Sequence, residues 1–312
     1  MGKVLVTGGA GFIGSHIAEV LLEHGYEVAV IDNFSTGSRH HIAHLPIEVY
    51  PCDITDPRVI DLIVSIHPDY IVHQAAQVSV PGSIRDILFD EEVNVKGSLH
   101  VIKAAVRVSA RKVLFASSAA VYGNPAELPI TPFHPARPES PYGLSKWTVE
   151  QYFKMAGKFY GLPYGILRYS NVYGPRQDAN GEGGVVAIFA DRITRKIPPV
   201  IYGDGEQTRD FIYVRDVAEA NARALAVRGN FCVNISSGKS VSIQELLGMM
   251  QKAAGTGLEV SFAEAREGDI RHSLLSNDGA KNLLGWEPAV GLPEGIRKTM
   301  DDARGNLLLQ PS

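Results

Sequence analysis

The segment VTGGAGFIG, residues 6–14, decides the fold class. It joins the apolar run KVLVTG, which predicts a buried strand, to GFIGSHIAEVLLEHG, whose apolar spacing predicts a helix. Gly8 permits the tight turn between them, Gly11 lets the backbone approach a pyrophosphate, and Gly14 lets the helix pack close to the strand. The phosphates would lie at the helix N-terminus, where free N–H groups and the helix dipole favour an anion.

The acidic residues that follow this turn indicate which dinucleotide it binds. Asp32 ends the next predicted strand, in AVIDN, where a carboxylate accepts hydrogen bonds from ribose hydroxyls and repels a 2′-phosphate. This residue therefore favours NAD over NADP. Asp53, in CDITD, is expected to meet the adenine amino group, whereas Asp56 before Pro57 is the better candidate for a helix cap.

Two further stretches are candidates for the cofactor site. Ala75 and Ala76, in HQAAQVS, follow a predicted strand, and their small side chains let a cofactor lie against the backbone. Asn94, in EEVNVKGS, falls in a long helical stretch from about Ile84 to Ser109. A buried amide there needs a partner, so a backbone or cofactor role competes with that of a simple surface residue.

Short β-branched runs alternate with helical patterns through the first half of the chain. The predicted strands after the first are EVAVID, IEVYPCDI, DYIVHQAA, RKVLFASS and PYGILRYSNVYG. Strands that alternate with helices predict a parallel sheet covered on both faces. The expected fold class is therefore α/β, with a doubly wound parallel (Rossmann) sheet.

The pattern changes beyond about Gly174, where the polar and glycine-rich loop RQDANGEGG begins. We expect an NAD-binding domain over residues 1–173 and a smaller C-terminal α/β lobe, mainly substrate-binding, over 174–312. The chain is free to cross between the domain and the lobe more than once. Helices are expected in the second part at 184–196, 214–228, 242–254, 278–284 and 292–305.

Tyr142 and Lys146, in SPYGLSKWTVE, carry the predicted chemistry. Their separation of four residues places both on one helix face. Lys146 is expected to stabilise the phenolate and lower the pKa of Tyr142, and a positive nicotinamide would lower it further, which yields a general base near neutral pH. Ser117 and Ser118, in FASSAAVYG, end a strand at the carboxyl edge of the sheet, where ligands bind, and a serine there can hydrogen-bond the same substrate oxygen.

Composition argues against several other classes of protein. The 312 residues are 45% hydrophobic and 21% charged, with a net charge of -4, so neither nucleic acid nor an anionic membrane is an expected partner. The two cysteines, Cys52 and Cys232, exclude a disulfide framework and fit a reducing cytosol. No apolar stretch approaches the roughly 20 residues needed to cross a bilayer. We expect a cytoplasmic protein, with no metal site.

Taken in order, these motifs resemble the extended short-chain dehydrogenase/reductase superfamily and, within it, the UDP-galactose (UDP-glucose) 4-epimerases. The resemblance runs from residue 7 to residue 273 and rests on TGGAGFIGSH, IDNFSTG, CDI, HQAAQ, NVKGS, SSAAVYG, PYGLSK, LRYSNVYGPRQ, YGDGEQTRDFIYVRDVA and REGDIRHS. It implies NAD-dependent inversion at C4 of a UDP-hexose through a 4-keto intermediate. The hexosyl group would turn over between the two hydride transfers while its nucleotide stays clamped.

The resemblance also implies roles for individual residues. Tyr142 is the implied base, Lys146 its partner, and Ser118 the second contact to the substrate oxygen. With the residues discussed above, the expected cofactor set is Gly8, Gly11, Phe12, Ile13, Gly14, Asp32, Asn33, Asp53, Ile54, Ala75, Ala76, Asn94, Tyr142 and Lys146. The expected substrate set is Ser118, Tyr142, Asn171, Arg209, Arg266, Asp269 and Ser273.

The nearest rivals within the superfamily are the 4,6-dehydratases and the UDP-glucuronate decarboxylases. The former typically carry an acidic pair, and the latter a Glu, where this chain has Ala119 and Ala120. Alanine neither donates nor accepts a proton, which favours epimerisation without elimination or loss of carbon. A UDP-glucuronate 4-epimerase needs no extra acid and stays open, and a catalytically silent NAD-binding regulator is the alternative from another class.

Two finer expectations follow from the resemblance. Ser273 stands where a bulky Tyr in related epimerases leaves no room for an N-acetyl group, so N-acetylated hexoses are expected to fit alongside UDP-glucose and UDP-galactose. A homodimer is also expected, because family members pair the helices at 84–109 and 141–160. In this chain both helices carry apolar residues beyond one stripe, among them Leu88, Phe89, Val149, Tyr152 and Phe153.

Overall fold

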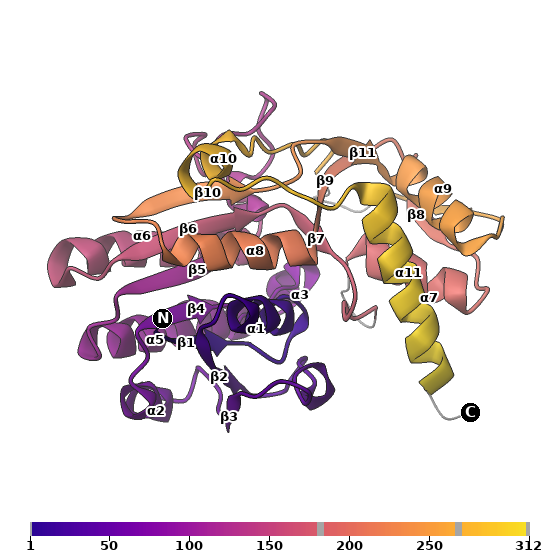
Figure 1. The fold of residues 1–312 in the computed structure, drawn as a ribbon. Coiled ribbons are helices and arrows are strands. Elements are labelled where there is room, and N and C mark those ends of the chain that lie inside the picture. Colours follow the sequence, from indigo (N-terminus) through magenta and orange to yellow (C-terminus); the bar gives the residue numbers. More distant parts are fainter. Residues whose placement is uncertain (1, 180–183, 266–269, 310–312) are drawn as a thin grey trace.

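The computed structural model describes residues 2–179, 184–265 and 270–309. A seven-stranded parallel sheet, in the order β10-β6-β5-β4-β1-β2-β3, forms the larger part (Figure 1). Its strands are β1 (Lys3–Thr7), β2 (Glu27–Asp32), β3 (Glu48–Pro51), β4 (Tyr70–His73), β5 (Lys112–Ser118), β6 (Tyr164–Tyr169) and β10 (Phe231–Ile235). The strand order reverses at β1 and β4, which makes the carboxyl edge of these two strands the expected ligand crevice. The predicted doubly wound α/β fold is confirmed.

Helices cover both faces of this sheet, and its strands are apolar for that reason. On one face lie α1 (Phe12–Glu23) and α8 (Val214–Leu225), and on the other lie α2 (Arg58–Ile66), α5 (Gly97–Arg107) and α6 (Pro141–Tyr160). Along β1, Val4 and Val6 belong to the first core and Leu5 to the second, and all three are fully buried. Side chains that alternate between two covered faces explain why the middle of the strand, from Val4 to Val6, is apolar.

The helical stretch predicted from about Ile84 to Ser109 is broken, which corrects the expectation of one continuous run. Asp86 has an extended backbone, with φ at −141°, and its carboxylate accepts the N–H of Phe89 at 2.9 Å. An aspartate in this arrangement ends one helix and caps the next. The stretch consists of α3 (Val80–Arg85), α4 (Ile87–Glu91), the π-helical turn η2 (Glu92–Lys96) and α5.

The second part of the chain builds a smaller lobe, to the right in Figure 1, and also returns to the large sheet. The lobe has a three-stranded sheet of β7 (Asn171–Tyr173), β9 (Thr208–Tyr213) and β11 (Ser240–Ser242), the pair β8 (Val200–Tyr202) and β12 (Ser261–Ala263), and the helices α7 (Val185–Thr194), α9 (Ile243–Ala254) and α11 (Leu292–Leu309). All five helices expected beyond residue 183 are confirmed. Two of them, α8 and α10 (Asp278–Leu284), pack with β10 on the large sheet, so the chain crosses between the two parts more than once.

Short elements and the chain's thiols complete the description. Two 3₁₀ turns, η1 (Arg39–His41) and η3 (Ala119–Tyr122), follow β2 and β5. Cys52 and Cys232 are free thiols. Within the three described ranges, no helix is long and apolar enough to span a membrane.

Candidate active site

The glycine-rich turn forms a cradle between β1 and α1. Gly8 has φ at +69°, in the left-handed region, and a Cβ there would lie 2.6 Å from the backbone nitrogen of Ala75. A Cβ on Gly14 would overlap the carbonyl oxygen of Gly8. Among the described residues, no side chain caps the N-terminus of α1, which begins after Gly11. The tight turn and the close packing are confirmed, and the uncapped helix end suits an anion such as a pyrophosphate.

Asp32 fixes this cradle from the end of β2. Its buried carboxylate accepts the N–H of Ala10 at 2.9 Å and the N–H of Phe34 at 2.8 Å. A carboxylate oxygen has two lone pairs, so each oxygen keeps capacity for one further donor. The residue can therefore hold the turn and still accept a ribose hydroxyl.

Asp53 and Asp56, the two acids of CDITD, both accept hydrogen bonds from nearby residues. Asp53 accepts from the N–H and the hydroxyl of Thr55, both at 2.8 Å, and from Asn33 Nδ2 at 2.7 Å. Burial alone would raise the pKa of Asp53, but these hydrogen bonds outweigh it and hold that pKa below its ordinary value. Asp56 accepts the N–H of Arg58, the first residue of α2, at 2.9 Å, which is the contact expected of a cap, although the N-cap position itself falls on Pro57. The adenine contact of Asp53 stays a prediction.

The remaining predicted cofactor residues lie around or behind the same edge. Ala75 and Ala76 are half-buried directly after β4. Phe12 and Ile13, in the first turn of α1, pack against the core of the smaller lobe. Ile54 is buried, and its side chain is what a Cβ at Gly97 of α5 would meet. Their contacts with a cofactor stay predictions.

Tyr142, Lys146 and Ser118 meet at the carboxyl end of β5. Ser140 caps the N-terminus of α6 by accepting the N–H of Gly143 at 3.1 Å, which sets the first turn that carries Tyr142. Lys146 Nζ donates to the carbonyl of Ala116 on β5 at 3.0 Å and lies 5.8 Å from the centre of the Tyr142 ring. The side chain of Ser118 lies beside the Tyr142 hydroxyl, close enough to act on the pKa of that group. The structure therefore brings these three residues together, and their catalytic roles stay predictions.

Burial decides the protonation of this pair. It raises the pKa of Tyr142 to about 12, against a lowering contribution from the Ser118 side chain, while the charge of Asp90 raises it further. Burial also lowers the pKa of Lys146 to about 8, although Asp90 opposes that change. The expectation that Lys146 lowers the pKa of Tyr142 below its ordinary value is thus corrected, because desolvation of the phenolate is the larger effect.

Asn94 and its neighbours support the first turn of α6 from behind. Asn94 is 2% exposed, so the interpretation as a simple surface residue was wrong. Its Oδ1 accepts the N–H of Gln77 at 2.9 Å, and its Nδ2 lies 3.0 Å from Asp90 Oδ1 and 3.2 Å from Ser145 Oγ. Ser145 in turn donates to the carbonyl of Tyr142 at 2.9 Å. The π-helical turn η2, which contains Asn94, places this amide against α6.

Sequence reasoning missed Glu150, although the signal was present. Glu150 follows Lys146 by four residues, as Lys146 follows Tyr142, so the three share one face of α6. The Glu150 side chain is fully buried and accepts from Ser117 Oγ at 2.6 Å and from Arg168 Nη2 at 2.6 Å. Ser117 is therefore engaged away from Tyr142, which agrees with the choice of Ser118 as the substrate contact.

The predicted substrate residues gather around β9 as far as the structure describes them. Asn171 is exposed at the start of β7 and pairs in register with Phe211 of β9. Arg209 of β9 is half-buried, and its Nη1 donates to the carbonyl of Thr208 at 2.9 Å. Ser273 is buried, and its N–H donates to the same carbonyl at 3.1 Å. The other two predicted residues, Arg266 and Asp269, lie outside the described residues.

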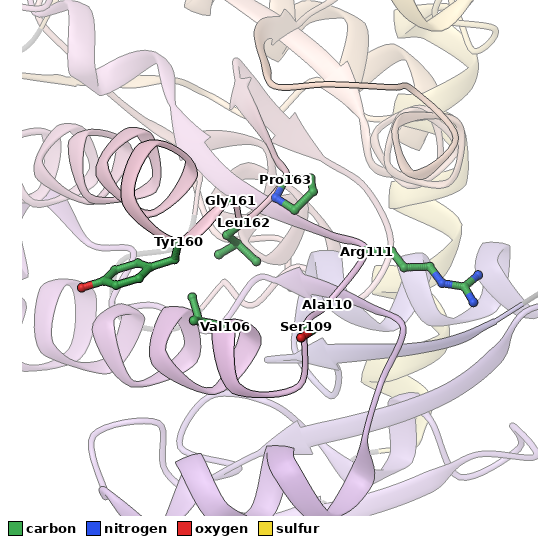
Figure 2. Close-up of a pocket in the computed structure, with 8 residues that line it drawn as sticks. All are labelled: Val106, Ser109, Ala110, Arg111, Tyr160, Gly161, Leu162 and Pro163. Atoms are coloured by element: carbon green, nitrogen blue, oxygen red, sulfur yellow. The ribbon is translucent and has the colours of Figure 1, made fainter.

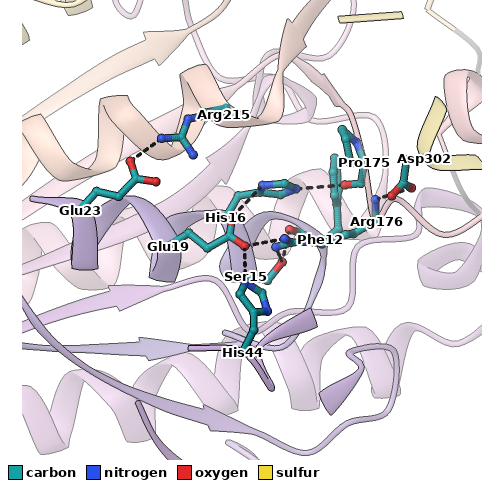
Figure 3. Close-up of polar contacts among 10 residues, drawn as sticks. All are labelled: Phe12, Ser15, His16, Glu19, Glu23, His44, Pro175, Arg176, Arg215 and Asp302. Atoms are coloured by element: carbon teal, nitrogen blue, oxygen red, sulfur yellow. Dashed lines mark hydrogen bonds and ion pairs between the residues drawn. The ribbon is translucent and has the colours of Figure 1, made fainter. Parts of the chain in front are cut away.

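A polar cluster joins the smaller lobe to α1 beside the glycine turn (Figure 3). Arg176 donates through Nη1 to Ser15 at 3.1 Å and through Nη2 to Glu19, while its backbone N–H donates to Asp302 of α11 at 3.1 Å. His16 reaches across in the same way, with Nε2 3.1 Å from the carbonyl of Pro175. These contacts fix α1 relative to the smaller lobe, which carries the predicted substrate residues around β9.

The hollow drawn in Figure 2 lies away from this site. It has a volume of about 310 Å³ and is lined by the ends of α5 and α6, including Ser109, Tyr160 and Leu162. Tyr142 and Tyr160 stand at opposite ends of α6, so about 27 Å of helix separates the hollow from the tyrosine of the candidate site. The chemistry is therefore assigned to the carboxyl edge of the sheet and not to this hollow.

Comparisons with known proteins point to one group. A model of the NAD dependent epimerase/dehydratase family matches residues 4–235. The UDP-glucose 4-epimerase of Mycolicibacterium smegmatis is 39% identical over 305 residues, which is 96% of this chain and 97% of that protein. The crystal structure of Thermus thermophilus UDP-glucose 4-epimerase in complex with NAD has a TM-score of 0.92 at 43% identity, covering 97% and 99% of the two chains. A UDP-N-acetylglucosamine 4-epimerase from Methanobrevibacter ruminantium M1, solved with UDP-N-acetylmuramic acid, has a TM-score of 0.93 at 35% identity, covering 98% and 99%.

Proposed function

The chain belongs to the NAD-dependent epimerase/dehydratase family, and from this premise we propose that it is an isomerase of the UDP-glucose 4-epimerase type. It inverts C4 of a UDP-hexose and uses NAD as a bound cofactor. The observation that carries this function is the meeting of Tyr142, Lys146 and Ser118 at the sheet edge beside the glycine cradle.

The geometry and charge of the glycine cradle fit NAD. Gly8 and Gly14 leave no room for a Cβ, and the uncapped end of α1 offers N–H groups to an anion. Asp32, buried beside the turn, suits the ribose hydroxyls of NAD and would oppose a 2′-phosphate. When bound, NAD supplies a reversible hydride acceptor for C4 of the sugar, which passes through a 4-keto intermediate.

Tyr142 and Ser118 handle the proton and the oxygen at that carbon. Ser118 holds the O4 hydroxyl, and Tyr142 takes its proton and later returns it to O4, after the sugar has turned its other face to the site. Because burial raises the pKa of Tyr142 to about 12, this base is protonated at neutral pH until positive charge is brought beside it. Lys146, held on the Ala116 carbonyl, keeps its ammonium on the same face of α6 as the tyrosine.

The smaller lobe holds the nucleotide while the hexosyl group changes face. Asn171 and Arg209 lie on adjacent strands, β7 and β9, and are the proposed phosphate contacts. Arg266 and Asp269 belong to the same proposal but lie outside the described residues. A clamp at the nucleotide end leaves the sugar free to rotate about the bonds to its phosphate.

The rival reactions lack their acid at this site. Ala119 and Ala120 form the turn η3 directly after Ser118, where a dehydratase or a decarboxylase needs a carboxyl group. UDP-glucuronate 4-epimerisation needs no such group and stays as the alternative. N-acetylated hexoses are included in the proposed substrates, with the likeness to the UDP-N-acetylglucosamine 4-epimerase and the small side chain of Ser273 in support.

The test is a product assay. Purified protein is incubated with UDP-glucose, UDP-galactose, UDP-N-acetylglucosamine and UDP-glucuronate, and the products are resolved by NMR. We expect UDP-glucose and UDP-galactose to interconvert to the same equilibrium mixture from either side. A 4-keto-6-deoxy sugar or a pentose as product would overturn the assignment, and turnover of UDP-glucuronate alone would favour the alternative.

The exposed apolar face of the helices at 80–91 and of α6 supports a homodimer. Leu88, Phe89 and Tyr152 are 82%, 53% and 42% exposed, so they are open to a partner. Val149 and Phe153 are fully buried against the sheet and are removed from the predicted dimer face. Light scattering at micromolar concentration is expected to give twice the mass of the chain, and a monomer would contradict the proposal.

The two free thiols support the cytoplasm as the proposed location.

A further inference from the structure

Asp210 is a fully buried carboxylate at the centre of the smaller lobe's contacts. Its Oδ1 accepts from the N–H and the hydroxyl of Ser237, both at 2.8 Å, and from the hydroxyl of Ser170 at 3.2 Å. Its Oδ2 accepts the N–H of Gly238 at 3.2 Å and the N–H of Leu275 at 3.3 Å. The donors come from segments that are 27 to 65 residues away in the sequence.

These hydrogen bonds end next to the proposed substrate residues. Ser170 directly precedes Asn171, Asp210 directly follows Arg209, and Leu275 comes two residues after Ser273. Asn171, Arg209 and Ser273 are thus each one or two residues from a group that Asp210 binds or from Asp210 itself.

A purely structural role would explain burial and hydrogen bonding but not this placement. A comparable carboxylate, Asp216 of α8, is 4% exposed and accepts the N–H groups of Ala289 at 3.0 Å and Val290 at 3.1 Å. Burial raises the pKa of both aspartates, against the hydrogen bonds that each accepts. The partners of Asp216 flank no proposed substrate residue, so it shares the chemistry of Asp210 without its position.

We propose that Asp210 is a positioning residue that sets the spacing of Asn171, Arg209 and Ser273, and thereby the affinity of the site for the UDP part of the substrate. It acts through the segments that it binds and does not touch the reacting atoms. The inference rests on the proposed function, because those three residues are substrate contacts only if the ligand is a UDP-sugar.

The first test replaces Asp210 by Asn. The amide can keep one oxygen toward Ser237 and Ser170, but its NH₂ group then faces the N–H groups of Gly238 and Leu275, so two hydrogen bonds are lost. We expect KM for the UDP-hexose and Kd for UDP to rise about 10- to 100-fold, with kcat and bound NAD within a few-fold of wild type. A loss of ground-state binding raises KM alone, whereas a general loss of folded enzyme lowers the apparent kcat.

Asp216→Asn is the matched control. The stability of both variants is measured by thermal unfolding, and their KM and Kd values are then compared. It is expected to lose stability without a comparable change in KM or in Kd for UDP. Equal effects of the two variants on UDP affinity would overturn the proposal.

Two less disruptive variants, Ser170→Ala and Ser237→Ala, test the proposal if Asp210→Asn does not fold. Ser170→Ala removes the hydrogen bond beside Asn171, whereas Ser237→Ala removes one beside no substrate residue. The first is expected to weaken UDP binding by several-fold and the second to leave it near wild type, and equal values would refute the positioning role. UDP binding is measured by calorimetry, so it reads out independently of turnover: wild-type protein that binds UDP but epimerises nothing refutes the proposed function and not this inference.

Discussion

The two sides of the candidate site are built in different ways. Tyr142 and Lys146 come from one helix, α6, whose turn sets their spacing. Asn171 and Ser273 come from segments more than 100 residues apart (171 and 273), which meet on β9 around Asp210. The spacing of Tyr142 and Lys146 is therefore set within one helix, and Ser118 joins them from the end of β5. The substrate side is fixed by long-range hydrogen bonds and is expected to shift as a unit.

The largest effect expected is that of Tyr142→Phe, which breaks the catalytic side alone. General base catalysis typically contributes about 10²–10⁴-fold, so kcat should fall by that factor. The hydroxyl contacts Ser118 and not the smaller lobe, so bound NAD and Kd for UDP should stay at wild-type values. Product assays measure kcat, and calorimetry on the same samples measures Kd for UDP.

Lys146→Met is the companion variant. It removes the ammonium that faces the tyrosine and should lower kcat by a similar factor, again without a change in UDP affinity. Wild-type turnover in Tyr142→Phe would show that another group is the base. A parallel loss of UDP affinity in both variants would show that the two sides are not separable.

The difference between the two sides also explains what could be predicted from the sequence. The glycine turn, the parallel sheet and the trio Tyr142, Lys146 and Ser118 depend on short motifs and on helical spacing, and the structure brings them together as expected. The break at Asp86 was missed because a helical apolar pattern continues through it. Asp210 could not be found, because each of its partners is at least 27 residues away and a buried aspartate looks like any other acid in a sequence.

Glu150→Gln tests how much the catalytic side depends on its buried support. The Glu150 side chain is fully buried and pairs with Arg168, which is 6% exposed. Removing the carboxylate charge leaves the guanidinium of Arg168 buried without a counter-charge, which typically costs about 3–5 kcal/mol. Urea unfolding should show a loss of that size.

The matched control for this variant is Glu92→Gln, which removes the exposed i,i+4 pair with Lys96. Exposed pairs contribute about 0–1 kcal/mol, so its unfolding midpoint should barely move. A loss in Glu150→Gln no greater than in this control would contradict the idea that the buried pair supports α6.

Ser273→Tyr tests the substrate side for the size of its sugar. A steric difference of one such side chain shifts selectivity by about 1–3 kcal/mol, or roughly 10- to 200-fold. Turnover of UDP-N-acetylglucosamine should fall by that factor relative to UDP-galactose, because the N-acetyl group loses its space. Because Ser273 is buried, a Tyr there can also lower the stability of the fold. Ser273→Val makes a smaller increase in side-chain volume, and thermal unfolding measures the stability of both variants. Equal losses for both substrates would reject the gating role.

Lys146 also gives the stability of the cofactor-free protein a dependence on pH. Burial lowers the pKa of Lys146 to about 8 from an ordinary value of 10.5. Between these two values the unfolded chain binds a proton at this lysine that the folded chain has lost, so stability rises with pH, by up to about 1.4 kcal/mol per pH unit. Below pH 8 both states hold the proton and the slope disappears.

The neighbours of Lys146 leave a clean window for this measurement. His73, whose pKa burial lowers to about 3, is neutral throughout, and Asp90 is the charge that acts on the lysine. Tyr142 acts in the opposite sense only above pH 10, because burial raises its pKa to about 12. Urea unfolding of wild type, Lys146→Met and the exposed control Lys96→Met is therefore compared between pH 8 and 10. Wild type and Lys96→Met should gain stability relative to Lys146→Met across this range, and three parallel curves would mean that the lysine is not desolvated as the structure places it.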